Sequence, residues 1–223
     1  PDSLSHISPR FKTPVVRILA TSAVMAVAIL TLDIGPIAKL ASAFKIVIFI
    51  AVNIALIVDA ESVLGLIAAP SRGHVDLGVP GWGARRFSLF DDSVHGTLAT
   101  RSLNPGKPLV MSASARHREE RVQLMLDKLS DLAGAAERLN AGSALKFCDV
   151  ASGASDVYPR TSPCYEWDLA AGDALVRAAG GRVTTLEGAP IRYNQWDSLK
   201  APKFVAAADP SVDYIKLIPD PDL

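Results

Sequence analysis

The sequence predicts an α/β protein in which a layered C-terminal α/β part follows two long apolar helices. Short strand-like runs alternate with helix-like segments between residues 63 and 209, a pattern typical of layered α/β domains. Residues 13–58 are overwhelmingly apolar, whereas residues 100–223 have the composition of an ordinary globular protein. Composition changes abruptly at Asp59–Ser62. We therefore expect three units: apolar helices over 1–59, the remnant of a first sheet over 60–107, and an α/β domain over 108–223.

The charge balance argues against one class of partner. The 223 residues include 23 basic and 23 acidic side chains, so a nucleic-acid polymer, which selects a basic excess, is not expected to bind. The two cysteines, Cys148 and Cys164, are too few for a disulfide framework, and we expect both to be free, buried thiols in a reducing compartment. The chain begins with Pro1 and has no signal-peptide pattern, which is typical of a fragment or a processed product.

The apolar N-terminal region predicts two membrane helices. The first run, Val15–Leu32, has 18 residues and one charge, which is just long enough to span a bilayer. The second, Ile37–Val58, is interrupted by Lys39 and Lys45. Neither run has the polar stripe that a helix on the surface of a globular core shows every turn. We expect a membrane partner for residues 13–58, with buried core helices as the alternative.

Basic residues before the first run predict its orientation. Arg10, Lys12 and Arg17 favour a cytoplasmic N-terminus, so two spans return the chain to the cytoplasm near Asp59. The remainder is then cytoplasmic and associated with the plasma membrane. Ser8–Val58, through "PRFKTP" and "IAKLASAF", resembles late membrane helices of amino acid permeases of the amino acid–polyamine–organocation group. The resemblance covers only two helices, so transport by this chain is not expected.

Further along the chain, apolar runs and breakers predict the remaining elements. A hairpin turn is expected at Ser71–Gly73 and a polar loop over 91–107. Strands are expected at Val63–Pro70, His74–Leu89, Pro108–Ser114, Ser155–Arg160, Arg182–Gly188 and Lys203–Asp209, and helices at Arg116–Leu132, Leu145–Val150 and Trp167–Ala179.

The segment "EWDLAAGDALVRAAGGRV" (Glu166–Val183) is the first candidate for chemistry. Asp168 stands at the start of a predicted helix, where free backbone N–H groups can fix a carboxylate and present it to a cation. The small residues Ala170, Ala171 and Gly172 let this first turn approach another backbone closely. The alternative is an ordinary carboxylate that favours the helix dipole.

Three further segments have residues suited to phosphate. Gly142 and Ser143 precede a predicted helix and offer N–H groups to an anion, with the charge of Lys146 nearby; a plain cap is the alternative. Arg160 of "SDVYPR" suits bidentate phosphate contact, although surface arginines are common. Ser114 of "SASARH" ends a predicted strand and can hold a phosphate or cap the next helix.

Together these segments resemble the inositol monophosphatase superfamily, and within it the 3'(2'),5'-bisphosphate nucleotidases. The resemblance runs from about Val63 to Asp209 through "GSALKFC", "SDVYPR", "EWDLAAG" and "APIRYN" (Ala189–Asn194). It implies a layered sugar-phosphatase-type fold, magnesium (Mg²⁺) as cofactor, and a small phosphorylated substrate. The implied reaction is conversion of 3'-phosphoadenosine 5'-phosphate to AMP and phosphate.

The resemblance also implies roles for individual residues. Asp168 would be a ligand to Mg²⁺, and Glu166 would face sugar or ring hydroxyls. Where the family has "SRSH", this chain has Ser114-Ala115-Arg116-His117, with the arginine displaced by one position. The implied substrate contacts are Ser143, Lys146, Tyr158, Arg160, Glu166, Ser114 and His117.

Most of the metal ligands that the resemblance implies have no counterpart in the sequence. The family draws them from a "GEE"-like helix and a "DPLDGT"-like loop, and neither occurs here. One carboxylate cannot hold a two-metal centre, so no water-activating residue is identified. We expect absent or weak activity unless a second polypeptide supplies the acidic half, and a fused or truncated reading frame. The alternatives are an inositol phosphate or fructose bisphosphate phosphatase and a membrane transport fragment.

Overall fold

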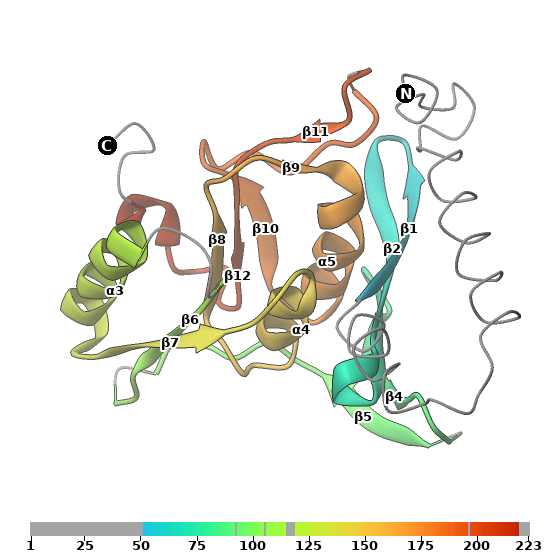
Figure 1. The fold of residues 1–223 in the computed structure, drawn as a ribbon, viewed down its shortest axis with the longest axis horizontal. Helices are drawn as coiled ribbons and strands as arrows, with labels where there is room; N and C mark the ends of the chain where they lie inside the picture. The colour runs from blue at the N-terminus through green and yellow to red at the C-terminus, as the bar shows by residue number, and fades with distance from the viewer. Residues whose placement is uncertain (1–50, 92, 105, 115–118, 196, 219–223) are drawn as a thin grey trace, which may run out of the picture.

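The computed structural model describes residues 51–218 apart from 92, 105, 115–118 and 196. These residues form layers: a first sheet, the helices α4 (Leu145–Ala151) and α5 (Glu166–Ala178), a second sheet, and α3 (Glu119–Ala133) beyond it (Figure 1). The two inner helices therefore have a sheet on each side. This arrangement agrees with the layered α/β class expected from the alternation of strands and helices.

The first sheet is an antiparallel meander. Its five strands follow chain order, and the 3₁₀ turn Pro70–Arg72 joins the second strand to the third, at the position where the sequence predicted a hairpin turn. The fifth strand lies inside the predicted loop over 91–107, so that part of the prediction is wrong. The strands are β1 (Val52–Val58), β2 (Glu61–Ala69), β3 (His74–Val79), β4 (Gly83–Ser88) and β5 (Val94–Leu98).

Strand β1 corrects the membrane-helix prediction for its last residues. Residues 52–58 were expected in a helix, yet they pair antiparallel with β2, and exposure alternates residue by residue along the strand. Asp59 and Ala60 have positive φ values of 50° and 64°, as a two-residue hairpin requires. A short apolar run cannot be assigned to helix or strand from periodicity alone, which explains the error. The composition change at Asp59–Ser62 therefore coincides with a hairpin turn within one sheet.

Among the described residues, no helix is long and apolar enough to cross a membrane. The rest of both expected spans and nearly all of the permease-like segment lie outside the described residues. Membrane attachment accordingly has no support in the part of the chain that the structure describes.

The second sheet has the order β10-β12-β8-β6-β7. Strand β6 runs parallel to β7 and β8, whereas β12 is antiparallel to β8 and β10. Its strands are β6 (Leu109–Ala113), β7 (Ala136–Asn140), β8 (Val157–Arg160), β10 (Arg182–Thr185) and β12 (Phe204–Ala207); β9 (Cys164–Tyr165) and β11 (Lys200–Ala201) form a separate pair. Sequence analysis missed β7, because "AERLN" has no clear apolar alternation.

Helix α5 packs closely between the sheets, and small residues make this possible. A Cβ added at Gly65 of β2 would lie 2.0 Å from the carbonyl oxygen of Ala171, and one added at Gly172 would lie 2.2 Å from the ring of Phe147. The close backbone approach predicted for this turn is found at Ala171, opposite Gly65, whereas Gly172 leaves room for the side chain of Phe147.

Two apolar clusters fill the spaces between the layers. The first surrounds α4 and α5 and includes Phe147, Leu169 and Phe204; the second lies under α3, where Met125 and Leu129 pack on the second sheet. A 3₁₀ turn at Tyr214–Leu217 closes the end of this second cluster. The two cysteines are free and buried, as expected.

Candidate functional site

Several of the candidate residues lie at one edge of the second sheet. Because β6, β7 and β8 are parallel, their carboxyl ends lie at the same edge. Ser114 follows β6, Ser143 follows β7, and Arg160 ends β8. Helix α5 begins shortly after β8 and brings Asp168 into this region. Segments that are separated in sequence therefore meet at this edge of the sheet.

Lys146 supports this edge from inside the protein. Only 2% of the residue is exposed, and Nζ donates to the carbonyl oxygens of Ala141 at 3.3 Å and Ser143 at 2.8 Å. Nζ also lies 4.9 Å from the centre of the Tyr158 ring. Burial, and next the charge of Arg160, lower the pKa of Lys146 to about 8. The ammonium thus fixes the loop after β7, with Ser143 exposed and held at a φ of 45°.

Tyr158 belongs to an aromatic cluster. Its ring meets Phe147 edge to face at 5.0 Å and Phe204 at 5.4 Å, and only 4% of the residue is exposed. Burial raises the pKa of Tyr158 to about 12, so the phenol stays neutral near pH 7. Its place under Lys146 indicates a positioning role rather than an open contact surface.

Arg160 and Asp168 reach the surface of the same region. Arg160 is half-buried and donates to the carbonyl oxygens of Ser162 at 3.3 Å and Pro163 at 3.2 Å. Asp168 is exposed, and its Oδ2 accepts the backbone N–H of Tyr165 at 3.4 Å. This capping-box contact confirms that backbone N–H holds the carboxylate at the start of α5. Both the capping role and a role as metal ligand remain compatible with it.

Glu166 lies deeper than a residue that faces solvent. It is 7% exposed, and its Oε2 accepts the backbone N–H of Asn194 at 2.9 Å. Burial raises the pKa of this carboxyl above its usual value. Glu166 therefore connects the start of α5 to the segment around Asn194.

The structure brings part of the predicted set together. Lys146, Tyr158 and Arg160 are neighbours, and Asp168 is near enough to influence Tyr158 electrostatically. Glu166 instead contacts Asn194. Ser114 is half-buried at the end of β6, and its carbonyl oxygen accepts a hydrogen bond from Arg138 at 2.9 Å. The remaining candidate, His117, lies outside the described residues.

Sequence reasoning missed two features of this edge. Arg138 reaches Ser114 from β7, a strand that was not predicted. Tyr165 and Trp167 stack at a centroid distance of 4.4 Å and an angle of 6°, and remain 41% and 39% exposed. The sequence gives both rings at the start of the helix, but only the fold shows that they form one aromatic surface beside Asp168.

The described residues do not complete a Mg²⁺ centre. Magnesium prefers a near-octahedral shell of oxygens, usually from carboxylates, water and substrate phosphate. Within the described ranges, Asp168 is not part of any cluster of three metal-capable side chains. Asp168 can supply one ligand, and the described residues offer no metal cluster around it.

Comparison with known proteins assigns the family. The model of the inositol monophosphatase family matches residues 47–216, and the chain belongs to this family. The match begins well before Val63, where the resemblance was expected to start, and it includes β1.

Three relatives define the similarity further. The 3'(2'),5'-bisphosphate nucleotidase CysQ of Escherichia coli K12 is 33% identical over 153 residues, covering 69% of this chain and 58% of that protein. The crystal structure of CysQ from Bacteroides thetaiotaomicron has a TM-score of 0.62 and 31% identity, over 74% of this chain and 65% of that one. An inositol monophosphatase from Zymomonas mobilis has a TM-score of 0.58 and 22% identity, over 75% and 62%. The chain thus spans less than two thirds of each.

Proposed function

We propose that this chain is part of a metal-dependent phosphomonoesterase of the 3'(2'),5'-bisphosphate nucleotidase type, whose substrate is 3'-phosphoadenosine 5'-phosphate. The described residues would form the substrate side of its site. The observation that carries the proposal is the edge of the second sheet, where Lys146 and Arg160 lie near Asp168, in a chain that is 33% identical over 153 residues to a 3'(2'),5'-bisphosphate nucleotidase.

Two positive groups at this edge suit a substrate with two phosphates. Arg160 is half-exposed and can present a planar fork of donors to a phosphate. The buried Lys146 adds positive charge near this edge, and its Nζ donates a hydrogen bond to the carbonyl oxygen of Ser143. We therefore assign direct contact to Ser143 and Arg160, and positioning to Lys146 and Tyr158.

The exposed pair of Tyr165 and Trp167 supports a nucleotide over an inositol phosphate. Aromatic side chains stack on any nucleobase, whereas inositol has no π-face to stack. The pair stands next to Asp168 at the start of α5. Replacing Tyr165 with serine should weaken binding of the bisphosphate nucleotide and leave binding of inositol phosphate unchanged, as isothermal calorimetry would show.

When bound, Mg²⁺ supplies charge neutralisation and an activated water in enzymes of this kind. Asp168 would contribute one ligand, and the other ligands would come from outside the described residues or from a second polypeptide. We therefore expect the 223-residue chain by itself to bind the nucleotide while releasing phosphate slowly or not at all.

Phosphate release from 3'-phosphoadenosine 5'-phosphate, measured with and without Mg²⁺, tests this proposal on the full chain. Inositol 1-phosphate and fructose 1,6-bisphosphate are the competing substrates. We expect the nucleotide to raise the melting temperature, and release to stay near background. Faster release from either competitor would overturn the substrate assignment.

The variant Asp168→Asn, with Asp127→Asn on the exposed face of α3 as control, separates the metal question from the substrate question. Release that requires Mg²⁺ and is abolished only by Asp168→Asn would contradict the expected incompleteness of the metal site. It would also locate the metal at α5.

A further inference from the structure

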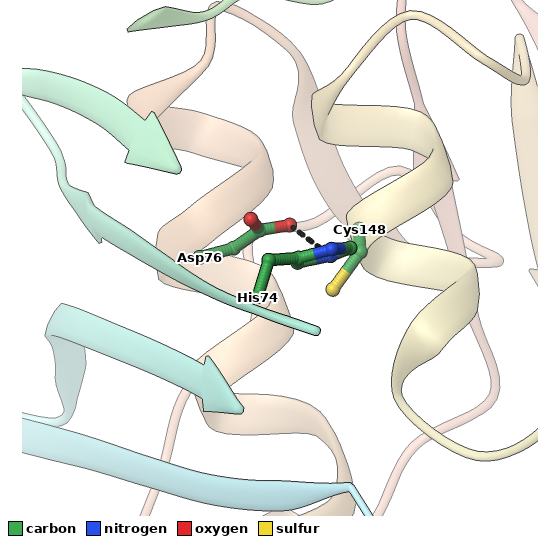
Figure 2. A group of neighbouring side chains, drawn as sticks. All are labelled: His74, Asp76 and Cys148. Carbon is green, nitrogen blue, oxygen red and sulfur yellow. Dashed lines mark ion pairs between the residues drawn. The ribbon is translucent and has the colours of Figure 1, made fainter. Parts of the chain in front are cut away.

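A second group of side chains lies between β3 and α4 and shares no residue with the candidate phosphatase site. His74 and Asp76 extend from β3 and Cys148 from α4, and all three point toward one another (Figure 2). Their potential ligand atoms lie within 4.8 Å of one another. His74 is 5% exposed, and Asp76 and Cys148 are fully buried. The phosphatase proposal does not use any of them.

Among the described residues, the hydrogen bonds of His74 involve only one of its two ring nitrogens. Nδ1 lies 3.3 Å from the carbonyl oxygen of Arg72, which can only accept, so Nδ1 carries the proton in the neutral ring. Nε2 is then an acceptor, and among the described residues it has no hydrogen-bond partner. It faces Oδ2 of Asp76 at 3.6 Å. A buried lone pair opposite a carboxylate oxygen is unfavourable unless a proton or a cation lies between them.

Asp76 already accepts two hydrogen bonds from Arg86, so its carboxylate is paired without a proton on His74. A metal cation satisfies the same lone pair without protonating the ring. It would also deprotonate the Cys148 thiol, as coordination to a divalent metal does.

We propose that His74, Asp76 and Cys148 bind a zinc-like divalent cation that connects β3 to α4. One imidazole nitrogen, one carboxylate oxygen and one sulfur are the ligand types of zinc sites, whereas magnesium takes oxygen ligands almost exclusively. Closing the three atoms around one ion requires side-chain movements on the order of 1 Å, given metal–ligand distances of about 2.0–2.3 Å.

Arg86 is compatible with this site and also orients it. Its Nε donates to Oδ1 of Asp76 at 2.7 Å, and its Nη2 to Oδ2 at 2.8 Å. A carboxylate oxygen has more than one lone pair, so Oδ2 can accept from Arg86 and still bind an ion. Such outer partners commonly fix the orientation of a ligating carboxylate. The thiolate of Cys148 would offset part of the positive charge that the ion adds.

The site would link two layers next to the candidate phosphatase edge. Cys148 is two residues after Lys146 on α4, so an ion at Cys148 would tether the first sheet to the helix that carries Lys146. The proposal does not depend on the phosphatase activity, and its test uses metal binding alone.

The test is a titration of the purified, metal-stripped 223-residue chain with Co²⁺, which reports thiolate ligation through a charge-transfer band in the near ultraviolet. We expect one Co²⁺ per chain with this band, displaced by Zn²⁺ but not by excess Mg²⁺. Cys148→Ser and His74→Gln should each weaken binding by more than about 100-fold, because even outer partners of a metal site contribute 10–100-fold.

Matched controls are available for both substitutions. Cys164→Ser changes the other buried thiol, and His95→Gln changes an exposed histidine of β5; both should keep the band. Circular dichroism verifies that each variant is folded. The proposal is overturned if the folded wild-type chain shows no thiolate band, or if the band survives Cys148→Ser in a folded variant.

Discussion

The ammonium of Lys146 is almost fully buried and bonded to two backbone carbonyl oxygens. The family resemblance implies that this lysine lies near substrate, and that stays a prediction; the sequence could not show that Nζ points into the protein. Burial depends on Tyr158 and Phe204, which come from strands far along the chain. The sequence motif was enough to place Lys146 on a helix, but not to predict that its side chain is buried against Tyr158.

The lowered pKa of Lys146 predicts a pH dependence of stability. Its folded pKa of about 8 is below the ordinary lysine pKa of 10.5, so between these values the unfolded chain holds a proton that the folded chain has released. The contribution of Lys146 to the free energy of unfolding therefore rises with pH over this window, by at most about 3 kcal/mol. Urea unfolding of the wild type and Lys146→Met at several pH values measures the difference.

The wild type should gain stability relative to Lys146→Met as pH increases from about 8 to 10.5. Comparing the two proteins removes the opposite trends of Tyr158 and Cys148, whose raised pKa values act equally in both. A constant difference across this range would show that Lys146 is not held in a desolvating environment.

For other candidate residues, too, the sequence indicated the place in the secondary structure but not the contacts of the side chain. Asp168 was predicted at the start of a helix and is found there, held by the N–H of Tyr165. Glu166 was expected to face hydroxyls, which stays a prediction, and its carboxylate accepts a hydrogen bond from the backbone N–H of Asn194, 28 residues further along the chain. The cluster of His74, Asp76 and Cys148 had no signal in the sequence, because β3 and α4 are far apart in the chain.

At the scale of elements, the sequence predicted helices and buried strands well where apolar spacing was regular. Helices α3, α4 and α5 lie within a few residues of their predicted ranges, as do β6, β8 and β12. Strands β1, β5 and β7 were missed for different reasons. The apolar run of β1 suits helix or strand equally, and β5 and β7 have few apolar residues.

Contact between α5 and the first sheet predicts a strong effect of a single methyl group. The Cβ in Gly65→Ala would lie 2.0 Å from the carbonyl oxygen of Ala171, and neither backbone can move without separating the layers. We expect the free energy of unfolding to fall by more than about 3 kcal/mol, beyond the usual cost of overpacking. Thermal or urea denaturation measures this.

Gly106→Ala is the matched control, since the nearest atom to its added Cβ is the Asn104 side chain at 3.4 Å. Its effect should stay within about 0.5 kcal/mol. Similar destabilisation by both substitutions would contradict the close packing of α5 on β2.

At the scale of the whole molecule, the first sheet includes residues that composition alone assigned to a membrane segment. The family match starts at residue 47, and β1 pairs with β2 over its full length. Composition gave a boundary near Asp59 because apolar content changes there, but that change marks the turn between two strands. Only pairing with β2, a property of the folded sheet, distinguishes the two interpretations.

Two shortened chains test this assignment. A chain of residues 47–223 should be more stable than one of residues 60–223, which lacks β1 and leaves the edge of β2 without its partner. We expect the shorter chain to unfold at lower urea and to aggregate more readily, as size-exclusion chromatography would show. Equal stability of the two chains would contradict a structural role for β1.

The most direct measurement of the central claim is a calorimetric titration of the 223-residue chain with 3'-phosphoadenosine 5'-phosphate and, separately, with inositol 1-phosphate. The account predicts that the nucleotide binds more tightly, and that Arg160→Gln weakens its binding by about tenfold or more, because a charge-assisted phosphate contact is lost. Tighter binding of inositol 1-phosphate, or nucleotide binding that Arg160→Gln leaves unchanged, would contradict it.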